Sequence, residues 1–496
     1  MKLTVEGNVN PYYVQTLCML FFPGVKFSKT DGPAEELEAI VRTAEEDTQI
    51  TASVVLRCGN QTAAAKTAEP YQERHTRQRS IKMAVGKAFF DAGEQLLSYR
   101  PVWGILTGVR PAKVANSYFE QGFDMPAVQD ILCGEFFVHP KKAALAVEIA
   151  MYERQIADAY AAADTCSLYI SIPFCPTRCS YCSFVSYTSR KLLALIPDYL
   201  NKLCTEINET CRLLRSLGKR VICVYIGGGT PTTLDEKQLA RLLDTVCGNL
   251  DPDTLSEFTL EAGRPDTITK EKLHIAAEHR VSRVSINPQT LDDKILEGIG
   301  RKHTAEDFYR AYDMAKDSGI PCINTDLIAG LPEETFLGFS KTVDKILMLR
   351  PENLTVHTFC VKKAADILRE GTDIYSRTGG DTGTSVEYAQ LSAKNAGYVP
   401  YYIYRQKNTA GNLENVGYAR DGMTGLYNVF MMEELHSVFA VGAGAVTKLV
   451  SPDRKRIERI FSPKYPYEYI KENVKSTINE GACKRIREFE QENRPT

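Results

Sequence analysis

Six short apolar runs separated by amphipathic stretches dominate the middle of this 496-residue chain. Such runs are typical of strands buried on both faces, and the helical periodicity between them, as over Leu195 to Leu217 and Glu236 to Leu250, predicts crossover helices. The predicted strands are Leu168 to Ile172, Val221 to Ile226, Glu257 to Leu260, Val281 to Ile286, Cys322 to Ile328 and Asn353 to Phe359. Repeated strand–helix units predict an α/β fold, a parallel sheet curled into a complete or partial (β/α)6 TIM-like barrel with its chemistry at the strands' carboxyl ends.

The pattern is different before this region. Residues 1–160 mix strand-like runs at Lys2 to Glu6 and Ala52 to Arg57 with a helical pattern over Ser80 to Leu97. The alanine-rich stretch from Gln155 to Thr165 is typical of a helix end and a linker. We therefore predict a separate N-terminal α+β domain of unknown role.

The pattern changes again after about residue 385. An aromatic strand-like segment, Tyr398 to Arg405, is followed by a glycine-rich turn at Val441 to Ala445 and a helical stretch over Tyr467 to Asn493. We predict that the barrel occupies residues 161–385 and that residues 386–496 form a smaller α+β appendage covering the substrate end of the barrel.

Composition and charge narrow the functional class. The net charge of -2 gives no general attraction to nucleic acid or anionic lipid, so we expect no nucleic-acid partner. The longest apolar run, near Leu17 to Val25, is too short to span a bilayer. The first residues do not resemble a secretory leader. We expect a cytoplasmic protein with no membrane span.

Cys175, Cys179 and Cys182 stand directly after the first predicted strand of the barrel, in the spacing Cys-x3-Cys-x2-Cys. Three thiolates on one loop suit a four-iron cluster that keeps one iron open for chemistry. A structural zinc site would want a further Cys or His pair, and a disulfide would be unusual in a reducing cytosol. An iron–sulfur cluster is therefore our first interpretation, with zinc or a chance grouping as the alternatives.

Polar residues also gather at the ends of the following strands. Gly227 to Thr232 reads Gly-Gly-Gly-Thr-Pro-Thr, which lets backbone groups approach a ligand closely or simply makes a strand-to-helix turn. Further along, charged or amide residues interrupt or follow apolar runs at Glu261, Gln289, Arg301 and Asp326. A buried carboxylate needs a partner, so these residues predict either one shared polar ligand or structural ion pairs such as Glu261 with Arg301.

These motifs resemble the radical S-adenosylmethionine (SAM) superfamily, and within it the oxygen-independent coproporphyrinogen III oxidase branch. The resemblance covers about Ser167 to Lys448 and rests on the cysteine loop, the Gly-Gly-Gly-Thr-Pro-Thr turn and the strand Asn324 to Pro332. The segments Trp103 to Pro111, Tyr401 to Asn408 and Gly411 to Tyr418 are similar to the HemZ-type coproporphyrinogen dehydrogenases.

The resemblance implies a role for each matching residue. Cys175, Cys179 and Cys182 would hold a 4Fe-4S cluster whose open iron binds the amino and carboxylate groups of SAM. The implied cofactor contacts are Tyr169, Tyr181, Gly228, Gly229, Thr230, Glu261, Gln289, Arg301, Asp326, Cys360 and Val446. The implied reaction uses a 5′-deoxyadenosyl radical to convert propionates of coproporphyrinogen III into vinyl groups.

The implied partners are a tetrapyrrole substrate and a reducing electron donor of flavodoxin or ferredoxin type. Basic side chains must then hold the tetrapyrrole carboxylates. Arg405, next to several tyrosines, is our candidate, with a surface arginine on an edge strand as the alternative.

Two departures from the family pattern keep other functions open. Phe184 stands where the oxidases carry a further Cys, which puts oxidase activity in question. The haem chaperones carry a His-Asn-x-x-Tyr-Trp segment, and Glu414 to Ala419 here replaces the His by a carboxylate, which argues against haem delivery. A haem-transfer protein therefore stays an alternative. A radical enzyme acting on RNA through the basic run Arg74 to Lys82 is another, although such a run is usually a solvated helix start.

Overall fold

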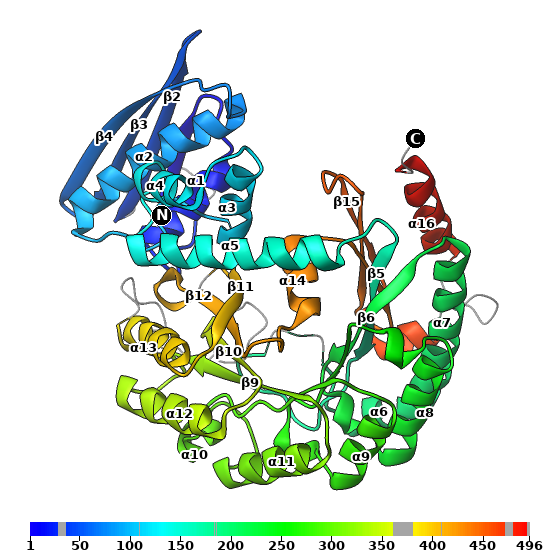
Figure 1. The fold of residues 1–496 in the computed structure, drawn as a ribbon. Helices are drawn as coiled ribbons and strands as arrows, with labels where there is room; N and C mark the ends of the chain where they lie inside the picture. The colour runs from blue at the N-terminus through cyan, green and yellow to red at the C-terminus, as the bar shows by residue number, and fades with distance from the viewer. Residues whose placement is uncertain are drawn as a thin grey trace.

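The fold consists of a four-stranded sheet and an 11-stranded sheet with helices packed on both (Figure 1). The computed structural model describes residues 1–27, 36–108, 110–182, 184, 186–360, 380–407, 409–471 and 480–493. None of the helices in these ranges is both long and apolar enough to cross a membrane.

The predicted parallel sheet is confirmed. Its six strands are β5 (Thr165–Ile172), β6 (Arg220–Gly228), β7 (Glu257–Glu261), β8 (Arg283–Ser285), β9 (Cys322–Ala329) and β10 (Asn353–Thr358). They pair in chain order, each parallel to the next. The sheet curves, and its outer helices are α6 (Arg190–Leu193), α7 (Ile196–Ser216), α8 (Glu236–Cys247), α9 (Lys270–Glu278), α10 (Asp293–Gly298), α11 (Ala305–Asp317), α12 (Phe336–Leu349) and α13 (Asp381–Asn395).

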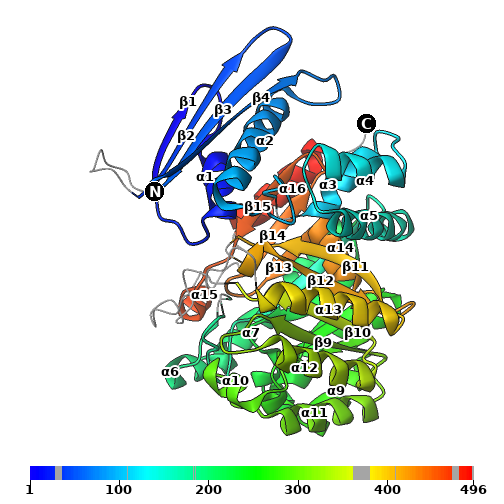
Figure 2. The same cartoon turned by 90° about the vertical axis from the view of Figure 1, so that its left-hand side faces the viewer.

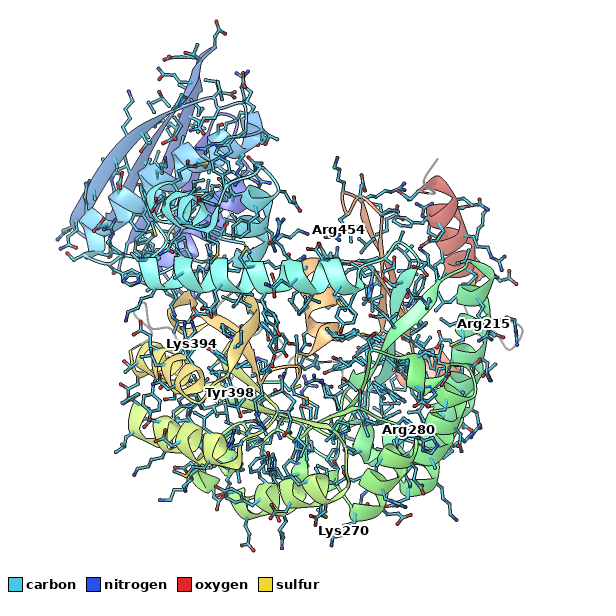
Figure 3. The ribbon with its side chains drawn as sticks, in the orientation of Figure 1. Arg215, Lys270, Arg280, Lys394, Tyr398 and Arg454 are labelled. Carbon is cyan, nitrogen blue, oxygen red and sulfur yellow. The ribbon has the colours of Figure 1, made fainter. Side chains whose placement is uncertain are left out.

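The outer helices form where the sequence pattern places them, for local reasons. In α8, Asp235 and Gln238 make a reciprocal capping box, and Leu239 and Leu243 on one face are fully buried. The outward sides carry exposed charges, such as Lys270, the first residue of α9, at the lower edge of Figure 3. Burial against the sheet therefore fixes one face of each helix and leaves the other to water.

The segment after residue 385 adds strands to both edges of the same sheet. Its elements are β11 (Val399–Arg405), β12 (Glu414–Ala419), α14 (Leu426–Glu433), β13 (Ser437–Val441), β14 (Val446–Val450), β15 (Ile457–Phe461), α15 (Pro466–Lys471) and α16 (Glu480–Glu492). β12 pairs antiparallel with β10, while β13 pairs parallel with β5. The edge strands β11 and β15 do not pair with each other in the described chain, so the barrel is open.

Helix α14 lies inside the curve of the sheet, and the segment Met423–Leu426 leads into it (Figure 1). The first residue of each of three strands holds this segment. Arg283 donates to the carbonyls of Met423 and Thr424 at 2.8 and 2.9 Å, and Asn353 donates to that of Met423 at 2.9 Å. Glu257 accepts the backbone N–H of Leu426 at 2.7 Å. The amino ends of the strands are thus closed by a late part of the chain.

The N-terminal region forms its own sheet and continues as helices that reach the barrel. Its elements are β1 (Lys2–Glu6), α1 (Pro11–Phe21), β2 (Leu37–Glu45), β3 (Gln49–Cys58), β4 (Gln61–Pro70), α2 (Arg77–Leu97), α3 (Pro111–Phe119), α4 (Met125–Gly134) and α5 (Pro140–Tyr160). Figure 2 shows α2 packed along β3 and β4. Of the helix predicted over Tyr467 to Asn493, residues 472–479 lie outside the described residues.

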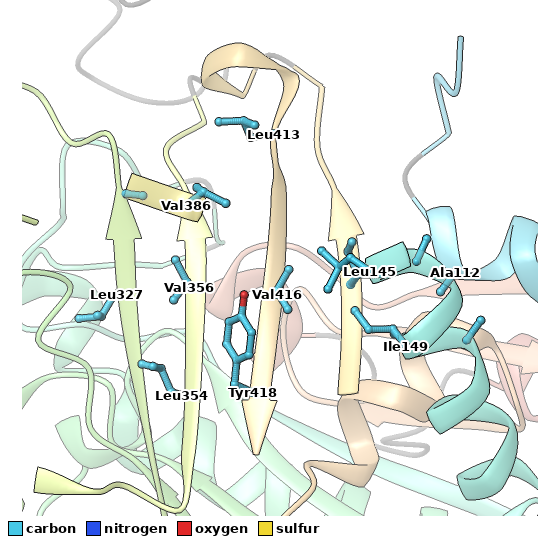
Figure 4. Close-up of a cluster of buried hydrophobic side chains, with 14 of the residues drawn as sticks. Ala112, Leu145, Ile149, Leu327, Leu354, Val356, Val386, Leu413, Val416 and Tyr418 are labelled. Atoms are coloured by element: carbon cyan, nitrogen blue, oxygen red, sulfur yellow. The ribbon is translucent and has the colours of Figure 1, made fainter. Parts of the chain in front are cut away.

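Helix α5 crosses the open side of the barrel and packs against β11 and α14. It continues to Tyr160, further than the predicted helix end, because its alanines favour the helix and Ile156 is buried beside α14. The predicted linker before β5 is therefore very short. Figure 4 shows Leu145 and Ile149 of α5 in a buried cluster with Val416 and Tyr418 of β12.

Candidate active site

One cavity of about 360 Å³ lies at the carboxyl ends of the parallel strands and extends into the sheet. Side chains from the cysteine loop, from every strand between β6 and β10 and from β11 and α14 line it. Of the predicted site residues, those that line it are Cys175, Cys179, Cys182, Tyr181, Gly228, Gly229, Thr230, Glu261, Gln289, Arg301, Asp326 and Cys360. These predicted residues span almost 190 positions of the sequence, from Cys175 to Cys360, and the fold brings them together around one cavity.

Backbone hydrogen bonds within the cysteine loop fix its shape. The N–H of Cys175 donates to the carbonyl of Tyr187 at 3.1 Å, and that of Cys182 donates to the carbonyl of Cys179 at 3.1 Å. Cys175 and Cys179 are each 8% exposed. Burial raises the pKa of the Cys175 and Cys182 thiols, so an adjacent cation or metal must stabilise their thiolates.

Two side chains from neighbouring strands approach the sulfur atoms. The hydroxyl of Thr230 lies 3.3 Å from Sγ of Cys175. Nη1 of Arg264 donates to Sγ of Cys179 at 3.6 Å. Donors of this kind are typical of the groups that surround metal-bound thiolates.

The glycine turn needs its glycines. Gly228 has φ of +109°, which side chains rarely adopt. A Cβ on Gly229 would lie 2.5 Å from the carbonyl oxygen of Phe174 and 2.8 Å from its nitrogen, both backbone atoms that cannot turn away. The turn therefore lies tightly against the start of the cysteine loop, where Thr230 donates its N–H to the same carbonyl at 2.7 Å.

Glu261 ends β7 beside this turn. The hydroxyl of Tyr225 donates to its Oε1 at 2.6 Å. Burial raises the pKa of Glu261 to about 7, although the Tyr225 hydrogen bond lowers it in part. The carboxyl group is consequently poised between its neutral and charged forms near neutral pH.

This pKa predicts a pH dependence of stability. Without added SAM, the folded state keeps the Glu261 proton between the ordinary carboxyl pKa of 4.5 and about pH 7, whereas the unfolded state loses it. Stability must then fall as pH rises through this window, by up to about 3 kcal/mol. We expect Glu261→Gln to remove this part of the pH dependence in urea unfolding at pH 5 and pH 8. An identical pH dependence in the variant would contradict the assignment.

Gln289, which follows β8, lies beside Asp326 of β9. The N–H of Gln289 donates to the carbonyl of Asp326 at 3.0 Å, and the backbone φ of Gln289 is +68°. Nε2 of His357 lies 3.6 Å from Oδ2 of Asp326. Oε1 of Gln289 is buried with no hydrogen-bond partner in the described structure. A buried acceptor of this kind needs a donor, which a polar ligand in the cavity would supply.

Arg301 is fixed by groups other than Glu261. Its Nη1 donates to the carbonyls of Gly263 and Asn287 at 2.9 and 3.0 Å, and its Nη2 donates to the hydroxyl of Tyr181 at 3.3 Å. These contacts replace the structural ion pair that the sequence offered as an alternative.

Three of the predicted residues do not line the cavity. Tyr169 stacks behind it, with its ring centroid 6.1 Å from that of Tyr225. Val446 begins β14, which lies between β13 and β15 at the other edge of the sheet. Arg405 is only 6% exposed, and its guanidinium binds the carbonyls of Leu106 and Asn412. The prediction that Arg405 contacts substrate does not fit this position, because the guanidinium is committed to the backbone outside the cavity.

Several lining residues were missed at the sequence level. They include Tyr225, Arg264, Arg283, Asn324, His357 and Tyr404. The alternation along β6 gave one usable signal, because Tyr225 shares a face with Gly227. For Arg264, nothing in the local pattern indicates a contact with a cysteine 85 residues earlier.

The residues around the cavity fit an iron–sulfur cluster and SAM. Three cysteines share one loop, and hydrogen-bonding side chains approach the sulfur atoms of two of them. The side-chain oxygen of Gln289 is buried without a hydrogen-bond partner in the described structure and could accept a hydrogen bond from a ligand. Among the described residues, no three Cys, His, Asp or Glu side chains are grouped to hold a single metal ion. A four-iron cluster needs no such convergence, because each thiolate binds a different iron.

Comparison with known proteins agrees with this geometry. The model of the radical SAM superfamily matches residues 169–346. The oxygen-independent coproporphyrinogen-III oxidase-like protein HemZ of Bacillus subtilis is 35% identical over 395 residues, 79% of this chain and 78% of that protein. The heme chaperone HemW of Bacillus subtilis is 31% identical over 314 residues, 61% of this chain and 77% of that protein.

The fold has a counterpart among solved structures. Coproporphyrinogen III oxidase (HemN) from Escherichia coli, a radical SAM enzyme, aligns with a TM-score of 0.51 and 21% identity over 65% of this chain and 71% of that one. The match to HemZ spans most of both chains, and the cysteine loop and cavity suit the superfamily's cofactors. The chain therefore belongs to the radical SAM superfamily and, within it, to the HemZ family of coproporphyrinogen III oxidase-like proteins.

Proposed function

We propose that this protein is a radical SAM enzyme that acts on a tetrapyrrole, with oxidative decarboxylation of coproporphyrinogen III propionates to vinyl groups as the leading reaction. The observation that carries the proposal is the continuity of the cavity. It runs from the three cysteines into a chamber inside the sheet that ends at Asn428 and Met432 of α14. A substrate in that chamber would lie directly beside the cofactor.

The superfamily's cofactors are a 4Fe-4S cluster and SAM. When bound, they supply one-electron chemistry through a 5′-deoxyadenosyl radical, while the chain supplies position and shielding. Cys175, Cys179 and Cys182 would hold the cluster, and the turn at Gly228 to Thr230 would meet the methionyl part of SAM. Glu261, Gln289, Arg301 and Asp326 would contact the rest of the cofactor. An electron donor of flavodoxin or ferredoxin type would reduce the cluster.

The polar side chains that line the rest of the cavity are fixed by hydrogen bonds to their neighbours. Asn324 donates to Ser285 and Asp326, both at 2.8 Å, and Asn415 donates to the carbonyl of Tyr404 at 3.1 Å. Fixed donors and acceptors of this kind can orient a substrate without rearranging. Cys175 and Cys179 are also buried, which limits the access of water to a cluster held there.

Haem transfer is the second candidate, because the HemW chaperones are also relatives. Glu414, which stands in place of the chaperone histidine, is 1% exposed and bound to Lys142 and Trp103. Both carboxylate oxygens of Glu414 are therefore occupied, and the side chain does not line the cavity. This contact favours the enzyme over the chaperone.

An RNA substrate receives no support from the basic run near residue 77. That run begins α2, with Thr76 as its N-cap. Arg74 and Arg77 pair with Glu135 and Glu45, and Arg79 donates to the hydroxyl of Tyr118 at 3.0 Å. The side chains are engaged in holding the N-terminal region together.

The decisive experiment is an anaerobic assay of the reconstituted protein with SAM, a reductant and coproporphyrinogen III. We expect both 5′-deoxyadenosine and a decarboxylated porphyrinogen. Formation of 5′-deoxyadenosine alone would reject this substrate while leaving the radical chemistry in place. In a parallel incubation with haem, a stable complex with a shifted Soret band and no turnover would favour the chaperone.

A further inference from the structure

Arg264 reaches from the end of β7 to the cysteine loop and is 3% exposed. Its Nη1 donates to Sγ of Cys179 at 3.6 Å, and its Nη2 donates to the hydroxyl of Thr177 at 2.8 Å. A buried arginine is costly unless its N–H groups are used, and these contacts use them on the loop itself. The cation therefore touches the loop at a sulfur atom and at a hydroxyl two residues before it.

Asp266 forms an ion pair with the same guanidinium. Its two carboxylate oxygens accept from Nε and Nη2 of Arg264 at 3.0 and 3.1 Å. The bidentate pair fixes the plane of the guanidinium and partly balances its charge. Burial raises the pKa of Asp266, but Arg264 holds it below its ordinary value, so the carboxylate stays charged.

The other two cysteines have different surroundings. The hydroxyl of Thr230 lies 3.3 Å from Sγ of Cys175, and Nη2 of Arg178 donates to the carbonyl of Cys182 at 3.4 Å. Arg264 is thus a cation whose N–H donates directly to one of the three sulfurs, that of Cys179. The three sulfur atoms therefore have different electrostatic surroundings.

We propose that Arg264 is a positioning residue that fixes the Cys179 thiolate and raises the reduction potential of the cluster, and that Asp266 limits this effect. A reduced cluster carries one more negative charge, so a hydrogen bond from a cation stabilises it relative to the oxidised form. The inference depends on the family's cluster and not on the substrate. Its failure would therefore leave the proposed decarboxylation untouched, and the reverse also holds.

The two residues predict shifts of opposite sign. We expect Arg264→Met to lower the ratio of reduced to oxidised cluster at a fixed potential by about tenfold, which is about 59 mV for one electron. Asp266→Asn should raise that ratio, because the full charge of Arg264 then acts on the cluster. The measurement is an anaerobic redox titration of the reconstituted full-length protein without SAM, followed by electron paramagnetic resonance.

Lys272→Met is the matched control. Lys272 is a cation near the same turn, but it donates to the carbonyls of Thr232 and Thr267 and not to a cysteine. Its potential should equal that of the wild type. Shifts of the same sign in the Arg264 and Asp266 variants, or no shift in either, would overturn the proposal. If Arg264→Met fails to hold iron, Asp266→Asn decides alone, and an unchanged or lowered potential there rejects the proposal.

Discussion

Alanine at Cys179 is expected to leave a folded protein that has lost its cluster and all formation of 5′-deoxyadenosine. Each thiolate binds a different iron, so removal of one leaves the cluster with two ligands and a second open corner. The change also leaves the guanidinium of Arg264 without its sulfur partner. Iron and sulfide should fall from about four of each per chain to nearly none. Iron analysis and the anaerobic assay with SAM measure the two effects.

A cysteine outside the loop provides the control. Cys247 lies at the end of α8, where its thiol donates to the carbonyl of His279 at 3.6 Å. Cys247→Ala should keep the full iron content and the rate of SAM cleavage. A Cys179→Ala protein that retained wild-type iron and activity would show that the loop does not hold the cluster.

Glu414→Ala is expected to destabilise the protein by about 3–5 kcal/mol, because it breaks a buried ion pair and leaves one charge uncompensated. Lys142 donates to Oε1 of Glu414 at 2.5 Å, and the side chains of the two residues are 4% and 0% exposed. Trp103 donates to Oε2 at 2.8 Å. Although burial raises the pKa of Glu414, Lys142 holds it below its ordinary value, so the carboxylate is charged at neutral pH. Denaturant unfolding followed by circular dichroism measures the loss.

The neighbouring residue of α5 supplies a matched control. Lys141 pairs with Glu387 at 3.3 Å, but the two side chains are 67% and 47% exposed. Glu387→Ala should therefore cost less than about 1 kcal/mol. The apolar double variant Lys142→Met with Glu414→Leu should recover much of the lost stability, since it removes both buried charges. Equal costs for Glu414→Ala and Glu387→Ala would show that the buried pair contributes nothing special.

The strands of the barrel and the cysteine loop could be predicted because their signals are local. A run such as Val221 to Ile226 indicates a buried strand by itself, and three cysteines on one loop indicate a cluster before any fold is known. The site residues Glu261 and Asp326 were visible for a similar reason, since each stands as a charge in an apolar strand. Each of these inferences needs only a few consecutive residues.

The rest depended on partners far away in the sequence. Arg405 looked like a substrate contact, yet its guanidinium binds the carbonyl of Leu106, 299 residues earlier, and lies 5.4 Å from the ring of Trp103. Arg264 and His357 owe their surroundings to neighbouring loops and strands. No local pattern indicates that β13 pairs with β5, because the two strands are separated by more than 260 residues.

The segment before α14 is bound by hydrogen bonds to Glu257, Arg283 and Asn353. This contact affects how the protein can fold during synthesis on the ribosome. When β5 to β10 have emerged, Glu257 and Arg283 can pair with each other, but the late segment that all three side chains bind is still missing. β5 and β10 also each present an open edge, and unpaired edges favour aggregation. The sheet that carries the cavity must therefore stay unfinished until the segment around Met423 to Leu426 has left the ribosome.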